Sequence, residues 1–333
     1  MSLSKKNLLL ILAPLAILLT AGLGFAIGKQ QCTQHNVTPN DNIPNLYTNK
    51  GATPPLPNTL DFAGENVPLD VYYVREALDK ELIVNCYQHS KTIQIIKRAA
   101  RYFPVIEPIL KKEGLPDDFK YLCMAESGLE NVVSPAKAAG FWQFIPTTAK
   151  FYGMEVSDDV DERYHLEKST LAACKYLKNA KNNLGSWSLA AAAYNMGEVN
   201  LKKNIENQNI NNYWDLYLNQ ETSRYVYRIL SYKLIMENPQ MYGYEFCPAQ
   251  LYHPIPCKEI TVTSPIPSLY DFAKEHNVSY KELKFLNPWL RNSKISVSGK
   301  KYTIKIPQKN KNNYFDLYRH IPNPYVVACD SVK

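Results

Sequence analysis

The stretch Lys120–Phe144, KYLCMAESGLENVVSPAKAAGFWQF, joins an apolar, helix-like run to a turn that is rich in aromatic residues. A single acid, Glu126, stands at the end of the apolar run, directly before Ser127. Such a carboxyl group either caps and solvates a helix or is kept away from water, where desolvation favours its protonated form. The residues on either side of this stretch have to separate these two interpretations.

Most of the neighbouring sequence has the apolar spacing of helices. Between residues 67 and 119, Val74, Leu78 and Leu82 share one helical face, and a later apolar run stops at Gly114-Leu115-Pro116. No strand pattern occurs between residues 66 and 240, so an all-α domain is predicted over residues 66–245. Its further helices are predicted at residues 117–126, 146–153, 167–185, 186–197 and 221–239.

The pattern changes after a proline-rich connector at residues 246–258. Residues 258–265 and 300–307 alternate apolar and polar side chains as strands do, and residues 268–288 read as two short helices. We therefore predict a small βααβ domain over residues 259–307, followed by a tail at residues 308–333 that has no clear pattern.

The N-terminal region predicts export. Lys5 and Lys6 precede residues 8–27, twenty uncharged and mostly apolar residues. As a helix this run spans roughly 30 Å, enough for a bilayer core, and the lysines would keep the N-terminus cytoplasmic. Residues 1–28 are either a cleaved signal peptide or a retained membrane anchor. Residues 29–65, rich in Asn, Thr and Pro, are predicted to form a linker.

The composition limits the partners and the chemistry. The chain has 333 residues, a net charge of +7 and 24 Tyr, which suits nucleic acid, an anionic envelope polymer or carbohydrate. Export makes nucleic acid an unsuitable partner. The seven cysteines form no CxxC pair or Cys/His comb, so no metal site is predicted. Cys247 and Cys257 are candidates for a disulfide, whereas Cys123 and Cys174 are predicted to be buried thiols.

Several segments, in order along the chain, carry a family resemblance. They are AESGLENVVSPAKAAGFWQFIPTTAKFYG, DERYHLEKSTLAACKYLKNAKNNLGSWSLAAAAYNMG, AAAYNMGEVN and ETSRYVYRIL. Over about residues 66–245 they resemble lytic transglycosylases of the lysozyme-like, goose-type fold, most closely the membrane-bound lytic transglycosylase D branch. Residues 259–307 are similar to a LysM module in element order and in YKELKFLNP. The opening EITVTSPIPSLYDFA departs from the aromatic-Thr-Val and Gly-Asp pattern that is usual in such modules.

The resemblance implies a mainly α lysozyme-like catalytic domain with a small LysM-like domain after it. Such enzymes cleave the β-1,4 bond between N-acetylmuramic acid and N-acetylglucosamine in peptidoglycan without adding water, and leave a 1,6-anhydro end. Glu126 would protonate the leaving oxygen and then, as a carboxylate, take the proton of the muramyl 6-hydroxyl. No cofactor or metal is implied.

The resemblance also implies roles for the residues around the acid. Ser127 is expected near Glu126 or the muramyl side chain, Gln143 in the sugar groove, and Tyr194 with Asn195 near Glu126 and the N-acetyl group. Tyr225 would place its hydroxyl near Glu126, and Glu221 would hold its helix or contact substrate. For the two tyrosines, the alternative is core packing with a polar tip.

Partners and location follow from the same resemblance. The expected partners are peptidoglycan glycan strands and the envelope membrane, the latter through residues 8–27. The expected location is the periplasm or cell envelope. Two other functions stay open at this point: a hydrolytic muramidase with the same fold, and an inactive exported protein that binds peptidoglycan or other glycans.

Overall fold

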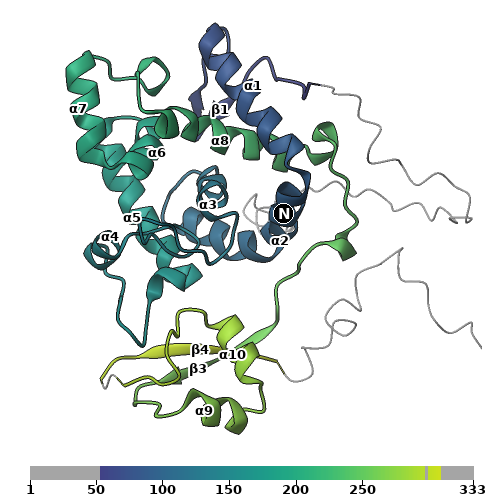
Figure 1. The fold of residues 1–333 in the computed structure, drawn as a ribbon, viewed down its shortest axis with the longest axis vertical. Coiled ribbons are helices and arrows are strands. Elements are labelled where there is room, and N and C mark those ends of the chain that lie inside the picture. The colour runs from purple at the N-terminus through teal and green to yellow at the C-terminus, as the bar shows by residue number, and fades with distance from the viewer. Residues whose placement is uncertain (1–52, 297–298, 309–333) are drawn as a thin grey trace, which may run out of the picture. The chain divides into compact units, whose positions relative to one another are not determined.

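The structure is a computed structural model that describes residues 53–296 and 299–308. The predicted signal or anchor segment at residues 8–27 and the tail after residue 308 lie outside the described residues. Up to residue 242, the elements are β1 (Asp61–Phe62), β2 (Glu65–Asn66), α1 (Tyr72–Tyr87), α2 (His89–Lys112), α3 (Phe119–Ser127), α4 (Pro146–Phe151), η1 (Glu162–Tyr164), α5 (Leu166–Leu184), α6 (Trp187–Met196), α7 (Glu198–Gln208), η2 (Tyr213–Asp215), α8 (Gln220–Glu237) and η3 (Pro239–Tyr242) (Figure 1).

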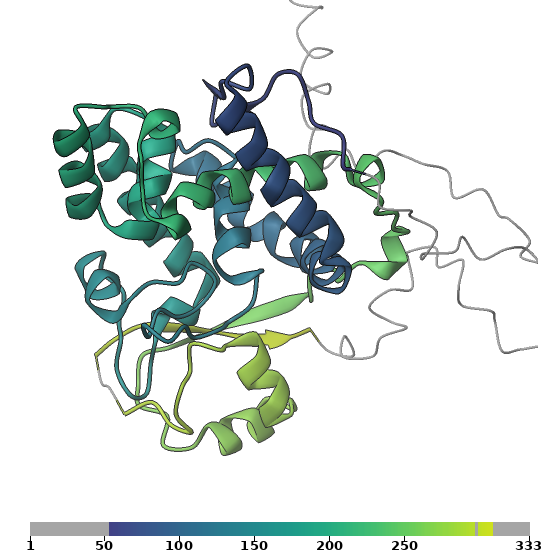
Figure 2. The ribbon, with the colours of Figure 1, turned by 45° about the horizontal axis from the view of Figure 1, so that its top comes forward.

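Helix α3 is the central element of the helical part. It contacts α2 and α8, while α1 packs along α8 and α5 packs against α6. Figures 1 and 2 show α3 with these longer helices around it in both views. Its apolar side chains Leu122, Cys123 and Met124 are almost fully buried in one continuous apolar core. A residue at the end of α3 is therefore placed close to the middle of the helical domain.

The ends of the helices follow from local sequence. Helix α3 stops at Gly128, which adopts a left-handed φ of 62° and whose amide donates to the Met124 carbonyl at 2.8 Å. Helix α6 begins after Ser186, whose hydroxyl accepts from the Leu189 amide at 3.1 Å. Helix α7 was not predicted, because Leu201 is its one buried residue and the helix has almost no apolar face.

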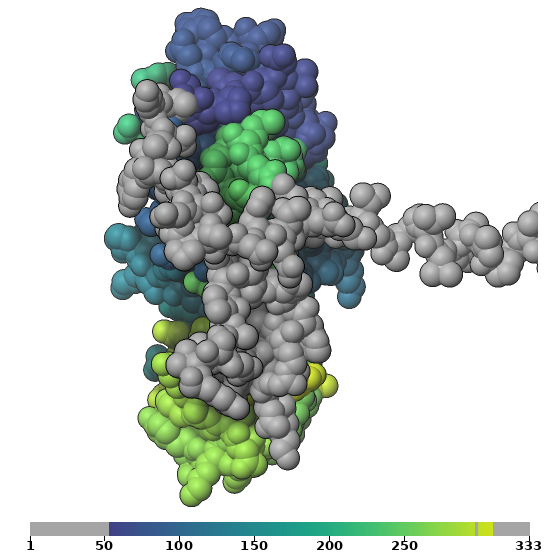
Figure 3. Space-filling model, turned by 90° about the vertical axis from the view of Figure 1, so that its right-hand side faces the viewer, coloured from purple at the N-terminus to yellow at the C-terminus, as the bar shows by residue number. Residues whose placement is uncertain are grey.

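Folded structure already begins before residue 66. The short strands β1 and β2 pair antiparallel, and Phe62 at their turn is fully buried against Phe119, with the ring centroids 5.6 Å apart. The segment after α8 also packs on the N-terminal helices, since the Tyr244 hydroxyl donates to the Cys86 carbonyl at 2.7 Å. In Figure 3 the green atoms of this segment lie beside the purple ones of the N-terminal part.

The C-terminal elements form the predicted βααβ unit. They are η4 (Pro248–Gln250), β3 (Cys257–Val262), α9 (Leu269–Glu275), α10 (Tyr280–Leu286) and β4 (Tyr302–Pro307). Strands β3 and β4 pair antiparallel from Cys257 opposite Pro307 to Val262 opposite Tyr302. Ser268 and Ser279 cap the two helices through their hydroxyls. The prediction of a mainly α domain followed by a small βααβ domain is thus confirmed.

Two predictions on cysteines can be compared with the structure, whereas the membrane prediction for residues 8–27 falls outside the described residues. Cys123 and Cys174 are buried thiols, as predicted. Cys257 carries a free thiol and forms no disulfide with Cys247, and its sulfur donates to the Ile255 carbonyl at 3.2 Å. Of the helices in the described part of the chain, none has both the length and the apolar character needed to cross a bilayer.

Candidate functional site

Glu126 lies in the last turn of α3, with part of its side chain open to solvent and the rest enclosed by protein. Burial raises the pKa of its carboxyl group to about 7, against the opposing effects of a hydrogen bond from Tyr225 and the positive charge of Arg228. The C-terminal end of a helix also carries partial negative charge, which disfavours a carboxylate there. Of the two interpretations of Glu126, the structure supports the one in which the carboxyl group is kept away from water.

Tyr225 is the direct partner of that carboxyl group. It lies on α8, and its hydroxyl donates to Glu126 Oε1 across 99 residues of sequence. The Tyr225 side chain is 1% exposed. Burial, and after it the charge of Glu126, raises the pKa of the Tyr225 hydroxyl, so the hydroxyl keeps its proton and remains a donor.

A charged cluster fixes the position of α8 beside Glu126. Glu81 of α1 is 1% exposed and contacts Arg224 and, at 3.6 Å, Arg228 of α8. The two arginines flank Tyr225 in the sequence, so this anchor fixes where the Tyr225 hydroxyl lies. Glu221 is exposed at the start of α8 and accepts from Arg228 Nη1 at 2.9 Å. Glu221 therefore touches the site through Arg228 rather than directly.

The turn after α3 brings the second predicted tyrosine to the site. The Tyr194 hydroxyl of α6 donates to the Trp142 carbonyl at 2.7 Å. Burial, and after it the charge of Glu126, raises the pKa of the Tyr194 hydroxyl. Gln143 follows in the same turn with a φ of 49°. Its side-chain nitrogen Nε2 donates to the carbonyls of Val132 and Gly140 at 3.0 and 2.7 Å. Its own side chain thus ties Gln143 to the backbone of the turn.

Ser127 and Asn195 use their side chains within the protein. The Ser127 hydroxyl accepts from the Leu129 amide at 3.1 Å and donates to the Cys123 carbonyl at 3.3 Å, which closes the end of α3. Asn195 Oδ1 accepts from the Thr222 hydroxyl at 2.7 Å and ties the end of α6 to α8. For each of the two residues, the structure thus shows side-chain hydrogen bonds that hold the end of a helix.

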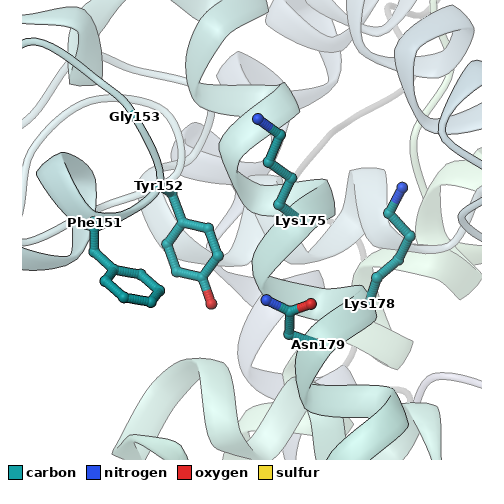
Figure 4. Close-up of a pocket in the computed structure, with 6 residues that line it drawn as sticks. All are labelled: Phe151, Tyr152, Gly153, Lys175, Lys178 and Asn179. Carbon is teal, nitrogen blue, oxygen red and sulfur yellow. The ribbon is translucent and has the colours of Figure 1, made fainter.

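A cavity of about 490 Å³ lies next to this region rather than over the acid. It is lined by Phe151, Tyr152, Gly153, Lys175, Lys178 and Asn179 (Figure 4). The ring centroids of Tyr152 and Tyr176 lie 5.6 Å apart, and those of Tyr176 and Tyr194 lie 5.0 Å apart. Two ring contacts therefore separate this cavity from the site. Within residues 53–296 and 299–308, no group of three or more His, Cys, Asp or Glu side chains is arranged to hold a metal ion.

The sequence did not point to Arg228, Glu81 or Trp142 as parts of this arrangement. Arg228 had a weak signal, because it lies three residues after Tyr225 and so shares its helical face. Glu81 had none, since its partners are on a helix more than a hundred residues away. Trp142 contributes a backbone carbonyl, which no side-chain pattern reveals.

Comparison with known protein families matches two segments of the chain. Residues 103–217 match the Transglycosylase SLT domain, and residues 258–310 match the Soluble lytic transglycosylase C-terminal LysM-like domain. Helices α3 to α7, with Glu126, Gln143 and Tyr194, fall in the first segment, and the βααβ unit, apart from the first residue of β3, falls in the second. The chain thus carries an SLT transglycosylase domain followed by a LysM-like domain.

The chain is also similar to curated proteins. It is 30% identical over 243 residues to the membrane-bound lytic murein transglycosylase D of Escherichia coli strain K12 and to that of strain O6:H1. Each alignment covers 71% of this chain and 52% of the relative, so the chain spans about half the length of these relatives. Over 112 residues it is 30% identical to a putative tributyltin chloride resistance protein of Alteromonas, with 33% and 54% of the two chains covered.

Proposed function

We propose that this protein is a peptidoglycan lytic transglycosylase in which Glu126 acts first as an acid and then as a base. The observation that carries the proposal is a single carboxyl group with a pKa of about 7 that lies within the SLT transglycosylase segment and accepts a hydrogen bond from the buried Tyr225 of α8. The substrate would be the β-1,4 bond between N-acetylmuramic acid and N-acetylglucosamine. The similarity to the E. coli lytic murein transglycosylases supports this choice.

In the first step, protonated Glu126 gives its proton to the glycosidic oxygen as the bond from that oxygen to C1 of the muramyl residue breaks. A pKa of about 7 leaves a large part of the enzyme protonated at neutral pH, which a general acid requires. The positive charge that develops at C1 would be stabilised by the acetamido group of the substrate, so no protein nucleophile is needed.

In the second step, the Glu126 carboxylate accepts the proton of the muramyl 6-hydroxyl while the 6-oxygen bonds to C1. The product is a 1,6-anhydro end, and the carboxyl group is protonated again. One carboxyl group is enough for both steps, unlike the two-carboxylate scheme of most glycosidases. In the described part of the chain, Glu221 is the carboxylate whose charge acts on Glu126, and it is engaged with Arg228.

The remaining site residues would orient the acid and the sugar. Tyr225 would hold the carboxyl group and stabilise its ionised form after the first step, since it donates a hydrogen bond. Tyr194 and Asn195 would face the N-acetyl group, and Gln143 and Ser127 the sugar chain. Glu221 would act without touching the acid, through its own charge and through Arg228, with which it pairs.

The cell envelope is the proposed location, since the E. coli relatives are membrane-bound by name. Residues 8–27 would direct the chain there as a signal or an anchor. Peptidoglycan strands are the proposed partner, and the stem peptides carry carboxylates that a net charge of +7 would attract.

The test is the mass of the products from purified sacculi. A lytic transglycosylase releases anhydro-muramyl ends, and a muramidase releases reducing ends that are heavier by one water. Anhydro products from the wild-type protein are expected, and none from Glu126→Gln. The matched control is Glu130→Gln, because this exposed glutamate is in the same segment and pairs with Arg98. Reducing products would show a muramidase instead, and undiminished digestion by Glu126→Gln would refute the role of this acid.

A further inference from the structure

The LysM-like domain is joined to one segment of the SLT domain, residues 155–167, by backbone hydrogen bonds. The Asp161 amide donates to the Trp289 carbonyl at 2.9 Å, and the Arg291 amide donates to the Asp159 carbonyl at 2.8 Å. Between them, Val160 and Leu290 form an antiparallel bridge. We call this join the seam. Its two segments pair through their backbones as neighbouring β-strands do, which a flexible linker alone would not provide.

Side chains strengthen the seam. The Asp159 carboxylate is 9% exposed and accepts from the Asn292 amide group at 2.9 Å and from the Ser296 backbone amide at 2.8 Å. The Tyr302 hydroxyl donates to Glu155 at 3.0 Å. At the edge of the seam, Lys305 pairs with Glu167. Hydrogen bonds to a charged acceptor are stronger than neutral ones, so Asp159 is the main polar anchor.

The apolar core of the LysM-like domain crosses the seam. Ala139, Val160 and Tyr164 of the SLT domain belong to the same buried cluster as Leu290 and Ile304. A LysM-like domain that only raised the local concentration of enzyme on its polymer would need a free linker. A shared core predicts instead that the two parts move together.

The seam segment contacts the turn at residues 137–144 through Arg163. That turn carries Gln143 and the Trp142 carbonyl. Asp161 holds the Arg163 guanidinium with bonds of 2.9 and 2.6 Å, and Arg163 Nη1 donates to the carbonyls of Lys137 at 2.8 Å and Phe144 at 3.1 Å. The fit is tight, because a Cβ at Gly140 would lie 1.9 Å from the Arg163 carbonyl oxygen.

We propose that the LysM-like domain is a positioning element of the catalytic centre, which holds the turn at residues 137–144 in place through Asp159, Asp161 and Arg163. This turn contains Gln143, and it holds Tyr194 because the Tyr194 hydroxyl donates to the Trp142 carbonyl. These three seam residues do not touch Glu126. The expected effect of these residues on kcat rests on the proposed function. Their expected effect on the structure of the turn at residues 137–144 does not.

The test compares hydrogen exchange and kinetics in full-chain variants. Asp159→Ala removes the anchor, and Asp158→Ala is the matched control, since it removes the same charge at an exposed neighbour. In Asp159→Ala, the amides of Ala139 and Gly140, which bond to Phe144 and Val132, are expected to exchange roughly tenfold faster, because hydrogen bonds to a charged acceptor are lost. Exchange in α1 should not change, and kcat should fall severalfold while KM stays the same.

A milder pair of variants keeps the inference testable if Asp159→Ala does not fold. Asp159→Asn keeps one acceptor oxygen and should restore part of kcat, and Lys305→Ala opens the edge of the seam and should raise exchange in the turn about twofold. The proposal is overturned if the amides at 289–291 exchange faster in these variants while those at 139–140 do not. If the wild-type protein digests no peptidoglycan, the proposed function fails, and the exchange comparison still decides whether the turn depends on the seam.

Discussion

The dry environment of Glu126 predicts a specific dependence of stability on pH. The pKa of this carboxyl group rises from its ordinary 4.5 to about 7 in the folded protein. A raised folded-state pKa means that the folded protein binds the proton more tightly than the unfolded chain. Glu126 therefore contributes most to stability below pH 4.5, and this contribution is lost as the pH rises to 7.

The size of the effect follows from the change in pKa. At 1.36 kcal/mol per pH unit, ionising this partly enclosed carboxyl group costs the folded state roughly 3 kcal/mol above pH 7. Glu126→Gln keeps the shape of the side chain and an oxygen that can accept from Tyr225, but it cannot ionise. The variant is therefore expected to gain up to about 3 kcal/mol in unfolding free energy relative to wild type between pH 4.5 and 7.

The assay is urea unfolding of wild type, Glu126→Gln and the control Glu130→Gln at pH values from 4 to 8.5. The difference between Glu126→Gln and wild type should be flat below pH 4.5, grow through pH 7 and level off above it. Glu130→Gln should show no such growth, because Glu130 is exposed. A difference for Glu126→Gln that is independent of pH would mean that the carboxyl group is hydrated and ionised at neutral pH, and the reasoning for the acid role would fail.

Three further outcomes are expected. Tyr225→Phe removes the hydrogen bond that lowers the pKa of Glu126, so the high-pH fall of kcat/KM should move upward by about one pH unit; an unmoved limb would contradict the contact. Glu126→Asp withdraws the carboxyl group from the Tyr225 hydroxyl and should cost roughly 100-fold in kcat in the anhydro-product assay, with little change in KM. Gly140→Ala puts a Cβ 1.9 Å from the Arg163 carbonyl and strains a φ of 82°, so thermal unfolding should show a loss of at least about 3 kcal/mol; a variant as stable as wild type would disprove the close packing.

Much of the local structure could be predicted from the sequence, since it depends on neighbouring residues. The apolar spacing places Glu126 at the end of a helix, and the alternation at residues 258–265 and 300–307 predicts the two strands of the C-terminal unit. Helix α7 escaped this reasoning because Leu201 is its one buried residue and Ile205 is only partly buried. Periodicity cannot reveal a helix without an apolar face.

The sequence alone determined which residue types stand at the site and in what order, and the ordered segments predicted a lysozyme-like transglycosylase domain before a LysM-like one. Only the tertiary structure decided that Glu126 is dry and meets Tyr225, that Glu81 anchors the arginines of α8, and that the seam joins the LysM-like domain to the Gly140 turn. The physical reason is that desolvation and hydrogen bonding between distant segments depend on how helices pack, and no short-range pattern in the chain encodes that packing.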